Sequence, residues 1–228
     1  MPEPLFLIAF LGGVLPALLW LFFWLMEDRC EPEPKRYIFF CFLAGALVVW
    51  PIYYLERFFI EYATGALLLL IWAVAEEVAK FLAAYFVALR SHVFDEPLDA
   101  VVYLVTAALG FSAVENILFL LGPLSDGNTL QALLTGNLRF IGATLLHTLA
   151  SATIGIAIAL AYYKPLEVRR LALMGGIVLA IALHALFNFF ILGAGGNATF
   201  WVFLFIWVGI IGALLFTERI KQPARDYC

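Results

Sequence analysis

The sequence contains few charged residues and few cysteines. Charged side chains make up 13% and hydrophobic side chains 65% of its 228 residues, whereas soluble domains have about a quarter charged and half apolar residues. The net charge of −4 comes without any dense basic stretch, so no nucleic-acid partner is expected. The three cysteines, Cys30, Cys41 and Cys228, are widely spaced, which excludes a disulfide framework or a zinc knuckle.

Long apolar runs account for most of the chain, whose mean hydropathy is +1.01. A helix needs about 20 apolar residues to cross a hydrocarbon core of about 30 Å. Runs of that kind predict seven spans, at residues 5–26, 37–55, 66–89, 98–121, 138–163, 171–192 and 199–216. Because span ends are imprecise, six or eight spans stay open. The prediction is an all-α, polytopic transmembrane bundle of about seven helices. It forms one membrane-embedded domain over residues 1–228, with no particular oligomeric state indicated.

The distribution of basic residues predicts the orientation of this bundle. Cytoplasmic loops are enriched in Lys and Arg, and ten of the 13 basic residues lie in the first, third and fifth loops and the C-terminal tail: Arg29, Lys35, Arg36, Arg90, Lys164, Arg169, Arg170, Arg219, Lys221 and Arg225. The N-terminus is therefore predicted outside and the C-terminus inside. Residues 1–10 lack Lys and Arg, so a retained first helix is expected rather than a cleavable signal peptide. The longest connection, 122–137, is predicted to be an outer loop.

Polar side chains interrupt four successive apolar spans. A charged residue at the centre of a membrane helix costs about 2.5–3.5 kcal/mol on insertion scales, so such residues are usually functional. The interrupting residues are Glu76, Glu77, Lys80, Glu115, Asn116, His147, His184 and Asn188. With a rise of about 1.5 Å per residue, the carboxylates and imidazoles lie roughly 9–15 Å below the predicted outer helix ends. This shared level predicts one common site in the outer half of the membrane.

The residue types at this site suit metal-assisted hydrolysis. Two histidines and one carboxylate are an adequate ligand set for zinc, which in hydrolases keeps a position open for water. A second glutamate can act as base, and Asn188 or Asn116 can donate to a developing oxyanion. Glu76 and Lys80 are four residues apart on one helical face, so Lys80 is either part of the site or a structural counter-ion. H-E-x-x-H is absent. A proton- or ion-coupled transporter and a non-catalytic scaffold stay open on this evidence.

Four motifs on successive helices resemble those of the PrsW intramembrane proteases. They are Glu76-Glu77-Val-Ala-Lys80, Phe111-Ser-Ala-Val-Glu115-Asn116, His147, and His184-Ala-Leu-Phe-Asn188, and the likeness covers about residues 66–190. This family is related to the CAAX prenyl endopeptidase and bacteriocin-processing superfamily. The resemblance implies a bacterial plasma-membrane protease that cleaves a membrane-anchored protein, such as an anti-sigma factor, near its extracytoplasmic side.

The resemblance also implies roles for individual residues. Glu76 and Glu77 are expected to be catalytic, and His147 and His184 are expected to bind a divalent metal, namely zinc, for which such ligands are typical. Glu115 is the third expected ligand, with Asn188 at the oxyanion and Lys80 and Asn116 in support. Because the prenyl endopeptidases have histidine where this chain has Glu115, a prenylated substrate is not expected. A metal-free mechanism, in which a glutamate and a histidine activate water directly, stays open.

Overall fold

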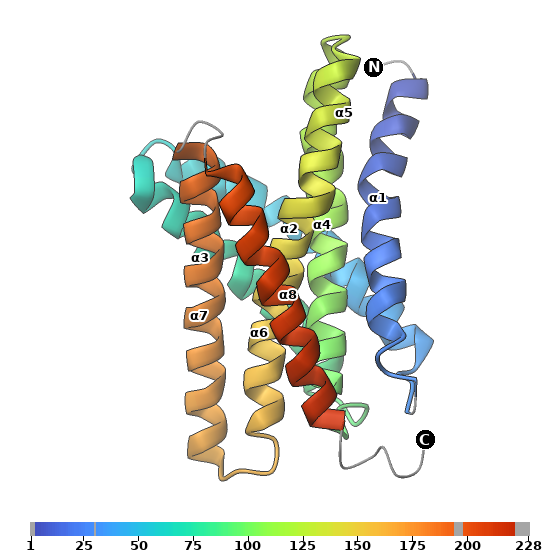
Figure 1. The fold of residues 1–228 in the computed structure, drawn as a ribbon, viewed down its shortest axis with the longest axis vertical. Coiled ribbons are helices and arrows are strands. Elements are labelled where there is room, and N and C mark those ends of the chain that lie inside the picture. Colours follow the sequence, from blue (N-terminus) through green and yellow to red (C-terminus); the bar gives the residue numbers. More distant parts are fainter. Residues whose placement is uncertain (1–2, 30, 194–197, 222–228) are drawn as a thin grey trace.

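The computed structural model describes residues 3–29, 31–193 and 198–221, and these ranges contain helices and no strands (Figure 1). The elements are α1 (Glu3–Leu25), α2 (Lys35–Phe59), α3 (Gly65–Ala84), the π-helical turn η1 (Tyr85–Leu89), α4 (Asp99–Ser125), α5 (Thr129–Leu138), the π-helical turn η2 (Arg139–Ala143), α6 (Thr144–Leu160), α7 (Leu166–Gly193) and α8 (Thr199–Lys221). Cys30, Arg225 and Cys228 lie outside the described residues. The predicted all-α class is confirmed.

Helix α4 forms the centre of the bundle. In its apolar window 67% of the residues are buried inside the protein, against 22% for α1, α7 and α8. A helix that is apolar on every side suits this central position, because it has no polar face to turn toward water. Helices α1, α2 and α6 pack directly on α4, while α1, α7 and α8 expose large apolar side chains, as membrane helices do toward lipid.

Glycines allow the central helices to approach each other closely, as small residues do between membrane helices. A Cβ atom on Gly45 of α2 would overlap the Ala107 carbonyl of α4. A Cβ atom on Gly155 of α6 would lie 2.6 Å from Val101 Cα of α4. Gly175 differs, since nothing lies within 4 Å of its Cβ position. The small residues thus bring α2 and α6 against the two sides of α4.

Six helical segments of the described chain are long and apolar enough to cross a membrane: Pro4–Leu25, Lys35–Phe59, Asp99–Ser125, Thr129–Leu160, Leu166–Ile191 and Thr199–Lys221. All seven predicted spans lie on helices. The third one corresponds to α3 and η1, where Glu76, Glu77 and Lys80 make the composition too polar to identify a span by hydropathy alone.

Two helix boundaries differ from the prediction. The predicted outer loop 122–137 is wrong, because α4 continues to Ser125 and α5 begins at Thr129. The chain reverses within residues 126–128, where Gly127 adopts a positive φ of 72° and the Asn128 side chain accepts the Gln131 N–H at 3.0 Å as an N-cap. Helix α2 also continues past its predicted end to Phe59, which places Glu56 on a helix instead of in a loop.

The first loop, the loop between η1 and α4, the loop between α6 and α7, and the end of α8 all lie at one end of the bundle. Side-chain contacts connect them in pairs: Glu33 with Tyr103, Tyr37 with His92, Phe94 with Tyr162, and Glu27 with Lys221. Most of the basic residues counted above belong to these segments. Helices α1 and α8 both run toward this end, at the bottom of Figure 1.

Candidate active site in the membrane-embedded cavity

A cavity of about 800 Å³ opens among α2, α3, α4, α5, η2, α6, α7 and α8. Most of its wall is apolar, and its polar lining includes Glu56, Glu76, Glu115, Arg139, His147, His184 and Asn188. Glu77 and Lys80 lie behind this wall and are fully buried. Ligand and active sites are typically apolar clefts of this size with a few convergent polar groups.

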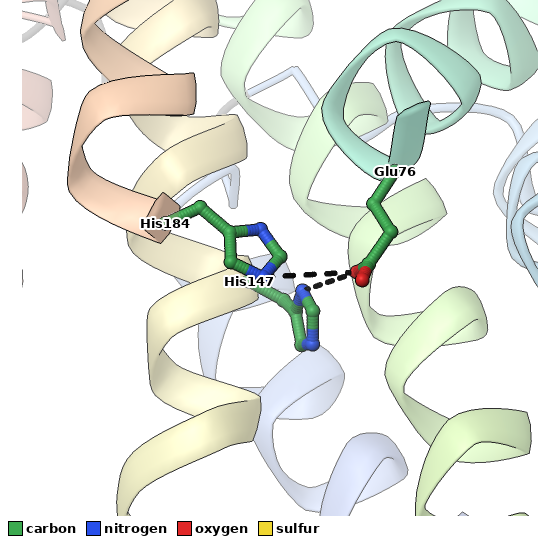
Figure 2. Close-up of side chains that lie close together, drawn as sticks. All are labelled: Glu76, His147 and His184. Carbon is green, nitrogen blue, oxygen red and sulfur yellow. Dashed lines mark ion pairs between the residues drawn. The ribbon is translucent and has the colours of Figure 1, made fainter. Parts of the chain in front are cut away.

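Glu76 of α3 faces both buried histidines. Its Oε2 atom lies 3.9 Å from His147 Nδ1 and 3.8 Å from His184 Nε2, and Figure 2 shows the carboxylate pointing at the two imidazoles, which come from α6 and α7. The three atoms all lie within 4.8 Å of one another. Glu76 Oε2 has no hydrogen-bond partner among the described residues although it is buried, so an acceptor oxygen and two ring nitrogens converge on one point.

Glu77 supports His184 from the side away from Glu76. Its Oε1 atom lies 2.6 Å from His184 Nδ1 and 2.6 Å from Lys80 Nζ. The four-residue spacing left a pairing of Lys80 with Glu76 open. The ammonium instead pairs with Glu77, three residues away.

Glu115 supports His147 in a similar way. Its Oε2 atom lies 2.8 Å from His147 Nε2 and accepts a hydrogen bond from Arg139 Nη2 at 2.6 Å. On the other side of the same ring, Lys80 Nζ lies 2.8 Å from His147 Nδ1. Each histidine therefore has a carboxylate behind it, and each carboxylate has a cation.

These contacts specify the tautomers of both rings. A carboxylate only accepts hydrogen bonds and an ammonium only donates them. His184 must therefore carry its proton on Nδ1, toward Glu77, and His147 must carry it on Nε2, toward Glu115. The lone pair of His184 Nε2 then faces the Glu76 carboxylate. The lone pair of His147 Nδ1 accepts from Lys80, and this nitrogen lies 3.9 Å from the same carboxylate. Carboxylate–histidine pairs of this kind orient imidazoles at metal sites.

Two asparagines flank this centre. Asn116 is buried and accepts the Arg139 Nε–H at 2.6 Å, while its own amide donates to Thr144 at 3.0 Å. It thereby joins α4 to η2 and α6. Asn188 lines the cavity one helical turn after His184, on the face that the sequence spacing predicted.

The expected metal ligands were His147, His184 and Glu115, with Glu76 and Glu77 as catalytic residues. The structure brings all five residues together. It places Glu76 between the two imidazoles and Glu115 on the far side of His147. The division of roles among these residues stays a prediction.

One cavity carboxylate was missed by the sequence reasoning. Glu56 of α2 lines the cavity, and its carboxyl interacts directly with the Glu76 carboxyl. The Trp72 indole N–H donates to the Glu56 carbonyl at 3.4 Å and holds this end of α2 against α3. The charged pair Glu56-Arg57 marked the end of the predicted span, although a helical reading continued to Phe59 would have turned Glu56 inward.

A family model described as PrsW family intramembrane metalloprotease matches residues 33–213. The chain belongs to the PrsW family. Protease PrsW of Geobacillus kaustophilus (strain HTA426) is 30% identical over 185 residues, covering 79% of this chain and 78% of that protein. Protease PrsW of Bacillus subtilis (strain 168) is 26% identical over 214 residues, covering 87% and 91%. That of Clostridioides difficile (strain 630) is 28% identical over 191 residues, covering 80% and 79%.

Membership in the PrsW family confirms the resemblance recognised in the sequence motifs. The protein is an intramembrane protease and a multi-pass integral protein of the bacterial cell membrane. The transporter alternative receives no support from these relatives. No solved structure matches this PrsW fold.

Proposed function

We propose that Glu76, His147 and His184 hold a divalent cation, most suitably zinc, and that this centre hydrolyses a peptide bond. The observation that carries the proposal is the convergence of Glu76 Oε2, His147 Nδ1 and His184 Nε2 within 4.8 Å of one another at a cavity wall. One carboxylate oxygen and two imidazole nitrogens are a hydrolytic zinc ligand set. The buried Glu76 oxygen that lacks a hydrogen bond is a further sign of fit.

The charges around the cavity also favour a divalent cation. Four carboxylates, those of Glu56, Glu76, Glu77 and Glu115, lie in or directly behind its wall, and Lys80 and Arg139 are the cations in contact with them among the described residues. With neutral imidazoles and all four carboxylates ionised, two negative charges have no fixed positive partner. Unpaired charge is costly in a low-dielectric interior, and a divalent cation would neutralise this excess.

A bound cation supplies Lewis-acid chemistry by polarising a carbonyl oxygen and making water more acidic. The protein residues do the rest. Glu77 and Glu115 fix the two imidazoles, and Asn188 is placed in the cavity wall to donate to the oxyanion. Lys80 Nζ lies 2.8 Å from His147 Nδ1, and since one lone pair serves one partner, cation binding there requires Lys80 to release this contact.

The bundle is proposed to cross the membrane seven times as one domain, with the N-terminus outside. The loops with most of the Lys and Arg residues share one end, as the positive-inside rule requires of cytoplasmic loops. Helices α1 and α8 run in the same direction (Figure 1), which supports an odd number of crossings. The extra crossing is α3 with η1, whose ionisable residues face the cavity and not lipid.

The substrate is proposed to be a membrane-anchored protein cut near its extracytoplasmic side. A mostly apolar cavity inside a helical bundle suits the unwound end of a transmembrane segment, because the apolar wall can pack against the apolar side chains of that segment. An anti-sigma-factor-like protein is the substrate that the family resemblance suggests.

The test uses purified protein in nanodiscs with a membrane-anchored substrate. Cleavage is compared among wild type, Glu76→Gln, His147→Gln and His184→Gln, and bound metal is measured by elemental analysis of the same samples. We expect one zinc per wild-type chain, and loss of both zinc and cleavage in the three variants.

Each other result has a defined meaning. Cleavage by a metal-free wild type that still requires Glu76 supports direct activation of water by a glutamate and a histidine, and overturns the cation proposal. Unchanged cleavage in all three variants overturns the site itself. Solute flux into liposomes without any cleavage would return the transporter alternative.

A further inference from the structure

Arg139 is the first residue of η2, and its guanidinium contacts three residues of α4. Nη2 donates to Glu115 Oε2 at 2.6 Å, and Nε donates to Asn116 Oδ1 at 2.6 Å. The guanidinium carbon lies 3.9 Å from the centre of the Phe119 ring. Only 13% of the side chain is exposed, so Arg139 is held on every side. From the sequence, Arg139 was interpreted as an interfacial anchor or as a partner of Glu115, and the structure shows the pairing with Glu115.

The oxygen that Arg139 binds is the one that His147 uses. Glu115 Oε2 lies 2.6 Å from Arg139 Nη2 and 2.8 Å from His147 Nε2. A chain of contacts therefore runs from Arg139 through Glu115 to His147, and ends at the ring nitrogen that faces Glu76. The second imidazole has an equivalent arrangement, because Glu77 Oε1 binds both His184 and Lys80.

We propose that Arg139 is a positioning residue for the cleavage reaction. It holds the Glu115 carboxylate against His147 and so fixes the Nε2–H tautomer and the ring orientation that present Nδ1 to Glu76 and His184. This inference rests on the proposed function, in that it assigns a supporting group to the same centre. Arg139 touches neither Glu76 nor His184 and acts through Glu115.

The chemistry of the side chain explains why arginine occupies this position. Its planar fork reaches two acceptors on adjacent residues, Glu115 and Asn116, while its face stacks on Phe119. A lysine ammonium can carry the charge but has no planar fork and stacks less well. The position at the first residue of a π-helical turn is also informative, because such turns frequently occur at functional sites.

A purely structural role makes a different prediction. As an anchor, Arg139 would only tie η2 to α4, and its loss would lower stability without changing His147. As a positioning residue, its loss frees the Glu115 carboxylate, and once the Lys80 donor at Nδ1 is also removed both tautomers of His147 populate. The tautomer of His147 therefore separates the two roles, and it can be measured whether or not the protein is turning over substrate.

The experiment uses the full chain labelled with ¹⁵N-histidine in detergent micelles. The sequence has three histidines, so a His92→Gln spectrum removes the loop signal and leaves the two buried rings to assign. Wild type is expected to show one His147 tautomer with the proton on Nε2. The comparison is made in a Lys80→Met background, which removes the donor at His147 Nδ1. There Arg139→Gln is expected to show a mixture, and Arg139→Lys to retain most of the wild-type form.

Kinetics give the second measurement. Loss of a residue that orients a metal-binding histidine typically costs 10- to 100-fold, so Arg139→Gln is expected to lower kcat by about that factor with KM nearly unchanged. In a Glu115→Gln background the same change should have little further effect, because Arg139 acts through Glu115. Arg90→Gln is the matched control, since Arg90 follows the other π-helical turn and stacks on Phe86 at 5.1 Å.

The proposal is overturned if Arg139→Gln keeps the single Nε2–H tautomer in the Lys80→Met background, or if its kinetic effect adds in full to that of Glu115→Gln. Should Arg139→Gln fail to fold, the Arg139→Lys spectrum and the Glu115→Gln cycle with that variant decide in the same way. If wild type cleaves nothing, the proposed function fails, yet the tautomer of His147 still tests the role of Arg139.

Discussion

Two groups of carboxylates in this protein are buried with different partners. The cavity cluster, Glu76, Glu77 and Glu115, is matched by the cations of Lys80 and Arg139 and by two imidazoles. The first-loop cluster consists of Asp28, Glu33, Glu96 and Asp99 at the end of the bundle where the basic loops lie. Its hydrogen bonds come from neutral groups: Asp28 accepts the Glu33 N–H, Glu33 accepts the Tyr103 hydroxyl, and Asp99 accepts the N–H groups of Asp95 and Glu96.

The two clusters differ in what compensates the negative charge of their carboxylates. Loss of water around the first-loop cluster raises the pKa of Glu33 to about 9, that of Glu96 to about 8 and that of Asp28 to about 7. Neighbouring carboxylates add to the effect. Protons therefore neutralise Glu33 and Glu96 near neutral pH, whereas the cations of Lys80 and Arg139 pair with Glu77 and Glu115 in the cavity cluster. A buried carboxylate with charged partners and a cavity marks chemistry, and one with protons and backbone partners marks structure.

The largest difference between the two clusters is expected when one carboxylate is removed from each. Glu76→Gln is expected to reduce cleavage by about a thousandfold, because it removes the group on which both imidazoles converge. Glu33→Gln is expected to leave cleavage unchanged, since that residue lies at the far end of the bundle. Both are measured as initial rates on one substrate in nanodiscs. Equal losses in the two variants would show that the clusters are not functionally distinct.

Removing a carboxylate should also lower the free energy of unfolding by different amounts in the two clusters. Glu77→Leu leaves Lys80 buried without its carboxylate, and breaking a buried pair from one side costs about 3–5 kcal/mol. The double variant Glu77→Leu/Lys80→Met removes both charges and should recover much of that loss. Glu96→Gln in the first-loop cluster should change stability by less than about 0.5 kcal/mol at pH 6, where Glu96 is already protonated.

Equilibrium unfolding in detergent compares these variants at one pH. A small effect of Glu77→Leu, or a double variant as unstable as the single one, would mean that Lys80 does not depend on Glu77. The matched pair in this test is Glu77 and Glu96, because both are glutamates near another carboxylate, the first fully buried and the second half-buried.

The comparison also shows what the sequence can and cannot predict. Apolar runs predicted the helices, and the level of the interrupting residues predicted that Glu76, His147 and His184 meet, because both depend only on chain length and helical rise. Spacing could not predict that Lys80 pairs with Glu77 and not with Glu76. This pairing depends on side-chain rotamers and on which carboxylate oxygen faces which ring nitrogen. Glu56 was missed because a charged pair was taken as the end of a helix.

The stability of the protein should depend on pH through the first-loop cluster. The folded protein keeps protons on Glu33 to about pH 9 and on Glu96 to about pH 8, whereas ordinary glutamates release them near 4.5. A raised pKa in the folded state gives stability that is complete below pH 4.5 and is lost as pH rises through the folded pKa. The melting temperature should therefore fall between about pH 5 and pH 9.

Glu33→Gln tests this assignment, because glutamine keeps an acceptor for Tyr103 and cannot release a proton. The variant should show a flatter dependence of melting temperature on pH than wild type, with the largest gain at pH 9. Tyr103→Phe is the control that removes the hydroxyl and keeps the acid. A dependence that is unchanged in Glu33→Gln would place the titrating group elsewhere.

The smallest expected effect concerns Lys221, a cation outside the first-loop cluster whose charge acts on Asp28. Its ammonium binds Glu27 at 2.6 Å and Glu218 at 3.1 Å, and its charge lowers the pKa of Asp28 against the effect of burial. Lys221→Met should cost less than about 1 kcal/mol, as is usual for partly exposed pairs. It should also move the pKa of Asp28 further above 7, measured by NMR titration.

Lys164→Met removes a positive charge from a neighbouring loop and should leave that pKa in place. If both variants move it equally, then the first-loop cluster responds to the general field of the basic loops and not to one cation, and the contrast with the specifically paired cavity cluster becomes sharper still.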